Sequence, residues 1–341
     1  MLNANELRTA MQGATAISDE VITHIYKQRW LQIWVPQNYG GLGCDFRTGL
    51  LHLYDWAKID GSLGWMLTLC AGANYFARNI QPETAKKLFA SEYTCFGGSG
   101  MVGGTADEQA DGTYLVNGLW HYATGAPYLS HFTLNAQVFK QGKPVLEADG
   151  TAVIRSFIIP KDQVTIIPNW KSMGMKATGT FSFEVKQAVI PADYYFVYDT
   201  FYTEDAIIKI PFRLFADLTL LVNYLGMAAH FMDEASNFLD HNRLHTHQKG
   251  IKIALEGILT YAIQLEGLLE HNIPISTTLE EEIHYYGECV LEQLIPQITQ
   301  VYVQLGIKAT QIDQPIHQVF CDFFTATQHV NFRAELKEQR M

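Results

Sequence analysis

The sequence predicts an α+β protein built from three successive parts. Residues 1–92 and 203–341 carry apolar side chains at the i, i+3, i+4 spacing of amphipathic helices. Between them, residues 93–202 contain short runs of Val, Ile, Thr, Phe and Tyr, separated by turn signals such as Asp111-Gly112 and Asp149-Gly150. We therefore expect an N-terminal helical domain, a middle β domain and a C-terminal helical domain.

The first part is predicted to hold several helices. Ile22, Ile25 and Trp30 share one face of a helix that must end before Pro36. A second helical pattern covers residues 48–59, is interrupted at residues 60–62 and resumes to residue 78. Pro82 marks the first turn of a further helix, because proline is favoured there.

The middle part shows strand patterns at residues 114–117, 132–139, 152–159, 164–167 and 181–189. Because no helical pattern separates them, they predict an antiparallel barrel or sandwich. The last part shows long helical patterns at residues 210–240, 248–272, 279–305 and 314–338. Helices of this length with short connections are typical of an up-and-down four-helix bundle.

Composition narrows the class of protein. The chain has 341 residues, 48% of them hydrophobic and 17% charged, which is enough apolar material for two or three folded domains. Its 24 Lys and Arg against 35 Asp and Glu give a formal net charge of −11. An acidic chain without a Lys/Arg run argues against nucleic-acid binding.

The cysteines and the apolar segments indicate a cytoplasmic protein. The five cysteines are widely spaced and form no CxxC pair, as expected of reduced thiols. The first residues show no basic and apolar signal-peptide pattern. The longest apolar stretch, residues 218–232, is interrupted by Asn223 and His230 and is shorter than the ~20 residues of a membrane span.

Two patterns lack the context that their usual chemistry needs, and two other catalytic motifs do not occur. Residues 98–103 match GxGxxG, but a strand rather than a helix follows, so a dinucleotide site is not expected. His241, His245 and His247 form the densest histidine cluster, yet no Cys or carboxylate completes a convincing metal site, so we predict no metal. A GxSxG nucleophile motif and a P-loop are absent from the sequence.

Aromatic residues are concentrated in the middle part. Trp120, His121, Tyr122 and Trp170 lie close in sequence to residues 124–125 and 178–180, which supply hydroxyl and backbone groups. Such a set suits a planar ligand such as a flavin, but residue type alone favours an ordinary apolar core with its turns.

The order of several motifs resembles the acyl-CoA dehydrogenase superfamily of flavoproteins. The matching segments are WVPQNYGGLG at residues 34–43, DGSLGW at 60–65, DGTYLVNGLWHYATG at 111–125, NWKSMGMKATGT at 169–180 and VIP at 189–191. The resemblance covers the chain from about residue 5 to its end. That family has an N-terminal helical domain, a middle β-barrel and a C-terminal four-helix bundle. The resemblance thus implies a barrel for residues 93–202.

The finer pattern is similar to the two-component flavin-dependent monooxygenases. The segment WHYATG at residues 120–125 and the C-terminal segment at residues 314–329 look like motifs of that branch. The last residue of the C-terminal motif faces the flavin in that branch, which implies His329 as the catalytic residue here. Histidine suits proton transfer near neutral pH because its reference pKa is about 6.5.

Three departures from the family patterns bear on function. The dehydrogenase motif TEPxxGSD is replaced by FGGSGMVGGT at residues 96–105. The carboxylate that removes a proton in dehydrogenases has no counterpart in the sequence, which argues against acyl-CoA oxidation. Cys321 stands where the oxygenase motif has an arginine before Asp322, and this departs from the oxygenase pattern as well.

The resemblance also implies a set of cofactor contacts and partners. Binding of FAD or FMN, including reduced flavin, is implied for Ser99, Thr124, Gly125, Trp170, Thr178, Gly179, Thr180 and Arg243. Arg243 corresponds to an arginine that reaches the flavin of a neighbouring subunit. A separate flavin reductase, a small organic substrate and a homodimer or homotetramer follow from the same resemblance.

These observations leave three functional hypotheses. The first is an oxygenase-like flavin-dependent oxidoreductase that uses reduced flavin and oxygen. The second is an acyl-CoA dehydrogenase with FAD and a base that the sequence does not reveal. The third is a relative that has lost catalysis and acts as a binding or structural protein.

Overall fold

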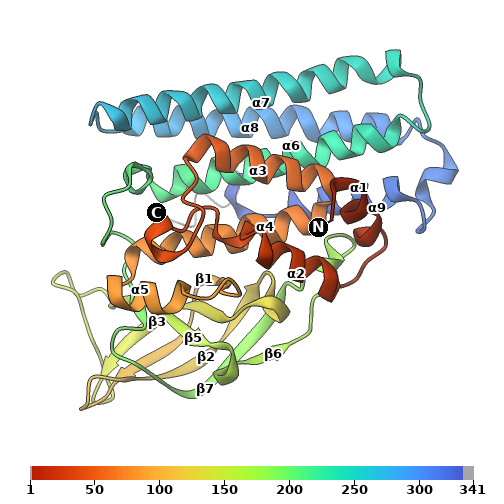
Figure 1. Cartoon of the computed structure of the whole chain (residues 1–341). Helices are drawn as coiled ribbons and strands as arrows, with labels where there is room; N and C mark the ends of the chain where they lie inside the picture. The colour runs from red at the N-terminus through yellow and green to blue at the C-terminus, as the bar shows by residue number, and fades with distance from the viewer. Residues whose placement is uncertain (1, 333–341) are drawn as a thin grey trace.

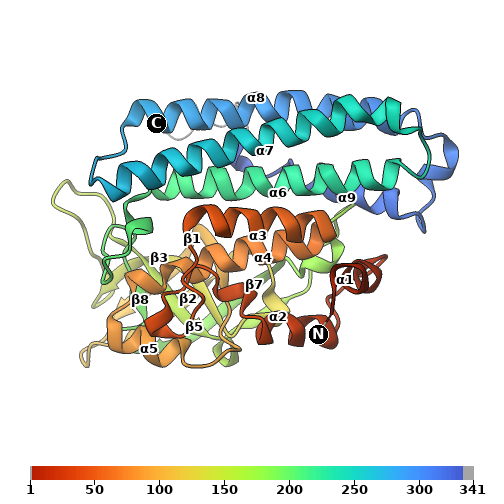
Figure 2. The same cartoon turned by 45° about the horizontal axis from the view of Figure 1, so that its top comes forward.

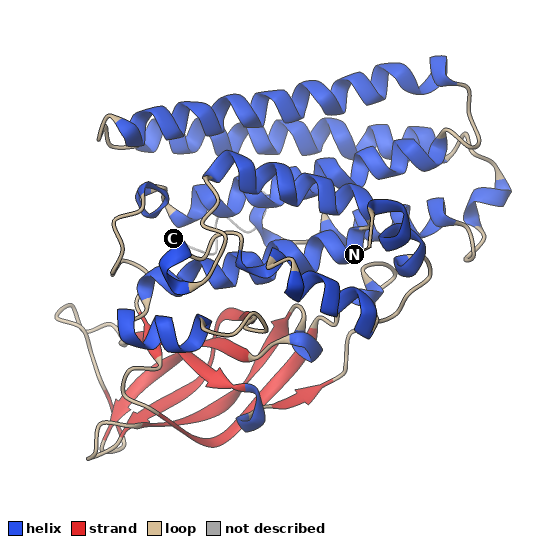
Figure 3. Cartoon of the chain, viewed as in Figure 1, coloured by secondary structure: helices blue, strands red, loops and turns tan. Residues whose placement is uncertain are grey.

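The computed structural model describes residues 2–332, which form stacked layers of helices on a β-sheet (Figure 1). Coloured by secondary structure, the chain separates into a helical side and a sheet side (Figure 3). The helices are α1 Ala4–Met11, α2 Asp19–Lys27, α3 Phe46–Ile59, α4 Gly61–Asn74, α5 Pro82–Phe89, α6 Phe212–Ala235, α7 His241–Glu270, α8 Thr277–Tyr302 and α9 Pro315–Ala326. The strands are β1 Phe96–Glu108, β2 Tyr114–Ala123, β3 His131–Lys140, β4 Lys143–Pro144, β5 Ile154–Pro160, β6 Thr165–Ile167, β7 Phe181–Ile190 and β8 Tyr195–Phe196.

The succession of helices, strands and helices is confirmed. The predicted helix over residues 48–59 is α3, and the helix that starts at Pro82 is α5. Element type changes between Phe89 and Phe96 and again after Phe196, near the predicted boundaries at residues 92 and 202. Buried apolar side chains from all three parts form one core. The division into three domains therefore stays a prediction.

The first helical layer is held by close contact at glycines. Helix α3 packs against both α4 and α6, and the turned view shows it lying along α6 (Figure 2). A Cβ at Gly64 of α4 would lie 2.3 Å from the Cα of Ala57, and one at Gly226 of α6 would lie 2.4 Å from the carbonyl oxygen of Tyr54. Both positions must lack a side chain for the helices to approach this closely.

The long helices α6, α7 and α8 lie side by side, with α7 and α8 forming the layer farthest from the sheet (Figures 1 and 2). Helix α6 is long and apolar enough to cross a membrane, and it is the one such helix among residues 2–332. However, 89% of its most apolar window is buried inside the protein, as in the core helix of a globular fold.

The predicted helix over residues 314–338 is wrong at its C-terminal end. Helix α9 ends at Ala326, where Thr327 caps it by donating its backbone N–H to Phe323, and a short 3-10 turn follows at Val330–Phe332. His329 therefore lies beyond the end of this helix. Residues 333–338 of the predicted helix lie outside the described residues.

The prediction of an antiparallel barrel is also wrong, because the sheet is open and contains a parallel pair. The strands form one sheet in the order β6-β7-β2-β1-β3-β5-β8, with β4 on β3, and the two end strands β6 and β8 do not pair. Strand β2 returns antiparallel to β1 on one side, and β3 then runs parallel to β1 on the other side. The chain reaches that side by crossing over residues 124–130, so one central pair is parallel.

The central strand β1 covers the glycine-rich segment that showed no strand pattern. Its glycines admit Trp120 of β2, because a Cβ at Gly103 would lie 2.6 Å from the indole Cδ1 and one at Gly104 would lie 2.7 Å from Cη2. The indole is fully buried and its Nε1–H donates to the carbonyl of Asn135 at 2.9 Å. Glycine inside a strand here marks the close approach of a large side chain.

The contact at Gly226 predicts a stability effect. We expect Gly226→Ala to lower the free energy of unfolding by about 1–3 kcal/mol, because the added methyl group overpacks the α3–α6 crossing. Gly250 of α7 is the matched control, since the nearest atom to a Cβ there is 3.9 Å away. Gly250→Ala should stabilise the protein by about 0.5–1 kcal/mol through helix propensity. Urea unfolding measures both, and equal effects would contradict the packing argument.

Candidate active site

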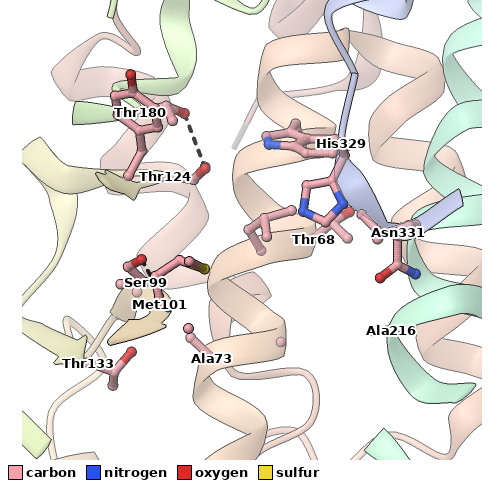
Figure 4. Close-up of a pocket in the computed structure, with 18 of the residues that line it drawn as sticks. Thr68, Ala73, Ser99, Met101, Thr124, Thr133, Thr180, Ala216, His329 and Asn331 are labelled. Carbon is pink, nitrogen blue, oxygen red and sulfur yellow. Dashed lines mark hydrogen bonds between the residues drawn. The ribbon is translucent and has the colours of Figure 1, made fainter. Parts of the chain in front are cut away.

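A cavity of about 720 Å³ lies between the sheet and the helices. Helix α4, strand β1, the end of β2, the first turns of α6 and the turn after α9 all contribute side chains to it. Figure 4 shows Thr124 and Thr180 at one corner, Ser99 and Met101 beside them, and His329 and Asn331 opposite. The volume is that of a pocket for a small organic ligand or cofactor.

Three threonine hydroxyls form a chain at the corner of the cavity. The Thr178 hydroxyl donates to the carbonyl of Met175 at 2.8 Å, and it lies 2.7 Å from the Thr180 hydroxyl, which in turn lies 3.1 Å from that of Thr124. Each hydroxyl has one proton, so Thr180 donates to Thr178 and Thr124 donates to Thr180. The oxygen of Thr124 is thereby left as an acceptor at the cavity wall.

Trp170 is fixed beside these hydroxyls. Its indole Nε1–H donates to the Met175 carbonyl at 3.0 Å, and its ring meets that of Tyr122 edge-on with centroids 5.7 Å apart. Both rings line the cavity. An aromatic wall next to a row of hydroxyl groups can hold a planar, polar-edged ligand.

The loop that carries Trp170 is tied to α9 by two hydrogen bonds. The backbone N–H of Gly174 donates to the Thr325 hydroxyl at 3.0 Å, and the N–H of Met175 donates to the carboxyl of Asp322. Gly174 must be glycine, because a Cβ there would lie 2.2 Å from the backbone of Cys321. These contacts join segments that are about 150 residues apart in the sequence.

Asp322 lies beside a second buried carboxyl, that of Asp60, and the two side chains are 2% and 3% exposed. Burial raises the pKa of Asp322 well above its usual range, and the charge of Asp60 raises it further. Burial likewise raises the pKa of Asp60. Gln318 donates to Asp60 at 2.9 Å, while Asp60 also caps α4 by accepting from the N–H of Leu63 at 2.9 Å.

His329 lines the cavity even though α9 ends before it. Its ring meets that of Trp65 of α4 edge-on with centroids 5.6 Å apart. The following turn is anchored by Asn331, whose amide donates to the buried carboxylate of Asp217. His284 of α8 lies 2.8 Å from the other oxygen of Asp217, so α6 and α8 together hold the turn.

Ser99 lies where β1 loses its regular pairing with β3. Its hydroxyl donates to the carbonyl of His121 at 3.1 Å and accepts from the N–H of Met101 at 3.3 Å. His121 is held in turn by the hydroxyl of Ser182, 2.6 Å from its Nδ1. The irregular segment therefore places Ser99 and Met101 on the cavity wall.

The predicted site residues divide into three groups. Those that line the cavity are Ser99, Thr124, Trp170, Thr180 and His329. Those directly behind its wall are Gly125, Thr178 and Gly179, and the N–H of Gly125 is used by the Thr178 carbonyl at 2.9 Å. The third group is Arg243, which is exposed on α7 and donates to Gln304. The cofactor and catalytic roles of all these residues stay predictions.

A polar cluster at the cavity was not predicted. Asn135 of β3 accepts from the hydroxyl of Ser156 and from that of Tyr198 at 3.4 Å, and its amide donates to Gly100 at 2.8 Å. All four residues line the cavity. The pairing of β1 with β3, of β3 with β5 and of β5 with β8, which precedes Tyr198, brings them together, so no local sequence signal marks them.

The histidine cluster at the start of α7 lies away from the cavity. His241 and His245 share a helical face, with ring centroids 5.4 Å apart. Among residues 2–332, no group of three or more His, Cys, Asp or Glu is placed to hold a metal ion.

Comparisons of sequence point to one group of enzymes. No family model matches the chain. It is 23% identical over 228 residues to the flavin-dependent monooxygenase oxygenase subunit HsaA of Mycobacterium tuberculosis, a match that covers 64% of this chain and 56% of that protein. It is 26% identical over 222 residues to indole-3-acetate monooxygenase of Pseudomonas putida, covering 64% and 55%. The matches thus span a little over half the length of these relatives.

Comparisons of structure extend further along the chain. The crystal structure of HsaA from M. tuberculosis has a TM-score of 0.86 at 20% identity, covering 97% of this chain and 91% of that one. XiaF from Streptomyces, solved with FADH2 and glycerol, has a TM-score of 0.86 at 16% identity, covering 98% and 91%. The resemblance to acyl-CoA dehydrogenase-like two-component flavin monooxygenases is thereby confirmed, and the shared fold extends over nearly the whole chain.

The buried carboxyl of Asp322 predicts a pH dependence of stability. A carboxyl whose pKa is raised in the folded protein stabilises it at low pH, and that contribution is lost as pH rises from about 4 toward the raised pKa. Asp322→Asn keeps the acceptor for Met175 but cannot ionise. The variant should therefore gain free energy of unfolding relative to the parent as pH increases from 5 to 8, measured by urea unfolding.

Asp322→Ala is the control for the hydrogen bond. It removes the acceptor and leaves the Met175 N–H unpaired, so it should be destabilised by about 1–3 kcal/mol at every pH. If the free energy of unfolding of the parent instead rises relative to that of Asp322→Asn as pH increases, the folded protein favours the ionised carboxyl. That result would contradict a raised pKa for Asp322.

Proposed function

We propose that this chain is the oxygenase component of a two-component flavin-dependent monooxygenase. It would take reduced flavin as the two-electron donor, add one atom of O2 to a small organic substrate and release the other atom as water. The observation that carries the proposal is the composition of the cavity. It brings Thr124, Thr180, Trp170 and His329 together, and no Asp or Glu is among the described residues that line it. The relatives and structural neighbours named above support the same activity.

The cavity suits the ring system of a flavin. A Cβ at Gly72 or Gly100, both on the cavity wall, would meet no atom within 4 Å, so the wall leaves open space there. Trp170 and Tyr122 offer aromatic surface, while Ser99, Thr124 and Thr180 offer polar groups for a ring edge. The oxygen of Thr124, polarised as an acceptor, would hold a ring N–H.

Bound reduced flavin would supply the activation of O2 in this cavity. Trp170 would orient the ring plane, and the loop held by Asp322 and Thr325 would keep Trp170 in place. The imidazole of His329 would take or give a proton at the reacting group of the substrate. The enclosing side chains would exclude water, which otherwise diverts the reaction to hydrogen peroxide.

The cavity composition weighs against the dehydrogenase alternative. Removal of a proton beside a thioester carbonyl needs a positioned base, which in this class of reaction is a carboxylate. Asp322 comes near, but its carboxyl bonds to the Met175 N–H behind the cavity wall. We therefore do not assign acyl-CoA oxidation.

Partners and assembly are proposed from the same resemblance. A separate flavin reductase would supply the reduced flavin, in the cytoplasm. Helices α6 to α9 would form the four-helix bundle of the family. Exposed apolar residues such as Ile253 and Ile263 of α7 and Tyr285 of α8 would contact another subunit in a homodimer or homotetramer, with Arg243 directed toward its flavin.

A flavin titration tests the proposal. Oxidised and reduced FMN and FAD are added anaerobically to the purified chain, and binding is followed by flavin absorbance and fluorescence. Reduced flavin should bind more tightly than oxidised flavin, and under ¹⁸O2 one labelled atom should appear in an aromatic substrate. No binding of any flavin would instead favour a non-catalytic relative, and bleaching of bound FAD by an acyl-CoA would favour a dehydrogenase.

His329 predicts a separate effect on chemistry. We expect His329→Ala to lower the rate of substrate oxygenation by about 100-fold to 10,000-fold, the usual loss for a general acid or base. Reduced-flavin affinity should stay close to that of the parent. His329→Gln, which keeps polar atoms but cannot transfer a proton near neutral pH, should show the same loss. Full activity in either variant would remove His329 from the mechanism.

A further inference from the structure

One end of the cavity is built from aromatic rings. Phe76 stacks on Phe196 with ring centroids 4.9 Å apart and meets Tyr198 edge-on at 5.1 Å. Its ring is tilted against that of Phe212, with centroids 4.9 Å apart. Phe215 continues the wall, 6.1 Å from Phe212. We call these five residues the ring wall. Tyr198 and Phe212 are 38% and 45% exposed, so they form its solvent-facing edge, while Phe196 and Phe215 are buried.

The cavity lining carries no formal charge apart from what histidine can acquire. No Lys, Arg, Asp or Glu is among the described residues that line it. Arg78 follows Phe76 closely in sequence, but its guanidinium pairs with Asp205 at 3.0 Å and donates to the carbonyl of Trp34. An anionic group buried beside the ring wall would lose its hydration without gaining a cationic partner, which is costly.

Four of the hydroxyl protons around the cavity are committed to the protein. Ser156 and Tyr198 donate to the amide oxygen of Asn135, Thr68 donates to the Gly64 carbonyl at 2.8 Å and Thr219 donates to the Ala216 carbonyl at 3.1 Å. Each hydroxyl has one proton, so these oxygens can only accept further hydrogen bonds, as that of Thr68 does from Asn223 at 2.8 Å. A carboxylate, which only accepts hydrogen bonds, finds no donor in these four hydroxyls, whereas an N–H or O–H group finds acceptors.

We propose that the cavity selects an uncharged aromatic substrate that carries an N–H or O–H donor, and that it rejects the carboxylated analogue of the same ring. The ring wall contacts the aromatic surface, and the hydroxyl oxygens accept from the donor. This selectivity rests on the proposed function for its chemical outcome, but the binding preference itself depends only on the cavity.

Matched ligands test the preference. Binding of indole, 1-methylindole and indole-3-acetate to the whole chain is measured by calorimetry at pH 7.5, first without flavin and then with reduced flavin. Indole should bind at least about 10-fold more tightly than indole-3-acetate, because the carboxylate is desolvated without a partner. It should bind about 5-fold to 10-fold more tightly than 1-methylindole, which lacks the donor. Equal or tighter binding of indole-3-acetate overturns the proposal.

A charge introduced into the lining should reverse the preference. Ala216 lies on α6 at the cavity, near Asn331 in Figure 4. Ala216→Lys is expected to raise the affinity for indole-3-acetate relative to indole by at least about 10-fold, through a charge-assisted contact. Ala216→Met, of similar length and no charge, is the control and should leave that ratio unchanged. Gln328→Lys, at the exposed rim of the same cavity, serves as the second charged variant if Ala216→Lys does not fold.

The outcomes separate this inference from the proposed function. Flavin binding together with a preference for indole-3-acetate overturns the substrate inference alone. Indole selectivity without binding of any flavin overturns the proposed function and leaves the selectivity in place. An unchanged ratio in both charged variants shows that the ligand lies beside neither Ala216 nor Gln328, and overturns its placement in this cavity.

Discussion

The site depends on the contact between α9 and the loop that precedes β7. Asp322 accepts from the N–H of Met175, Thr325 accepts from that of Gly174, and Asp322 also lies against Gly61 at the start of α4. Three segments that are distant in sequence thereby meet at one point. The loop before β7 carries Trp170, Thr178 and Thr180, α4 carries Trp65, and α9 leads into the turn that carries His329.

The same contact explains why glycine is required at two positions. A Cβ at Gly174 would overlap the backbone of Cys321, and one at Gly61 would lie 2.7 Å from the Cβ of Asp322. The carboxyl itself is buried, and Cys321 beside it supplies no cation. A neutral carboxylic acid keeps both its hydrogen bond and its tight packing without a buried charge. Replacement of the arginine in the oxygenase motif by Cys321 is therefore compatible with a retained Asp322.

The sequence predicts the helices well because their signals are local. Apolar spacing marks α3, and proline marks the start of α5. The predictions fail where residues distant in sequence determine the local structure. Strand β1 is rich in glycine and shows no strand pattern, since its glycines are required by Trp120 of the neighbouring strand. The helix after residue 314 stops at Ala326 because the following turn is held by Asp217 of α6. Likewise, the parallel pairing of β1 and β3 follows from a chain crossing that no strand pattern contains.

Some residues of the candidate site lie in recognisable motifs, whereas others are brought together only by the fold. Motif resemblance predicted site residues at the threonine corner and at His329, which the structure brings to one cavity, because they occur in recognisable segments. It could not identify the ring wall or the Asn135 cluster, which are brought together only by folding. Their members come from the 3-10 turn Tyr75–Asn79, from β1, β3 and β5, from β8 and the segment after it, and from α6. Motifs shared with relatives thus describe the part of the cavity suited to a common cofactor. The residues that no motif marks line the remaining part, and since differences in substrate between enzymes of one fold must arise in such residues, the uncharged ring wall is where the specificity of this chain is decided.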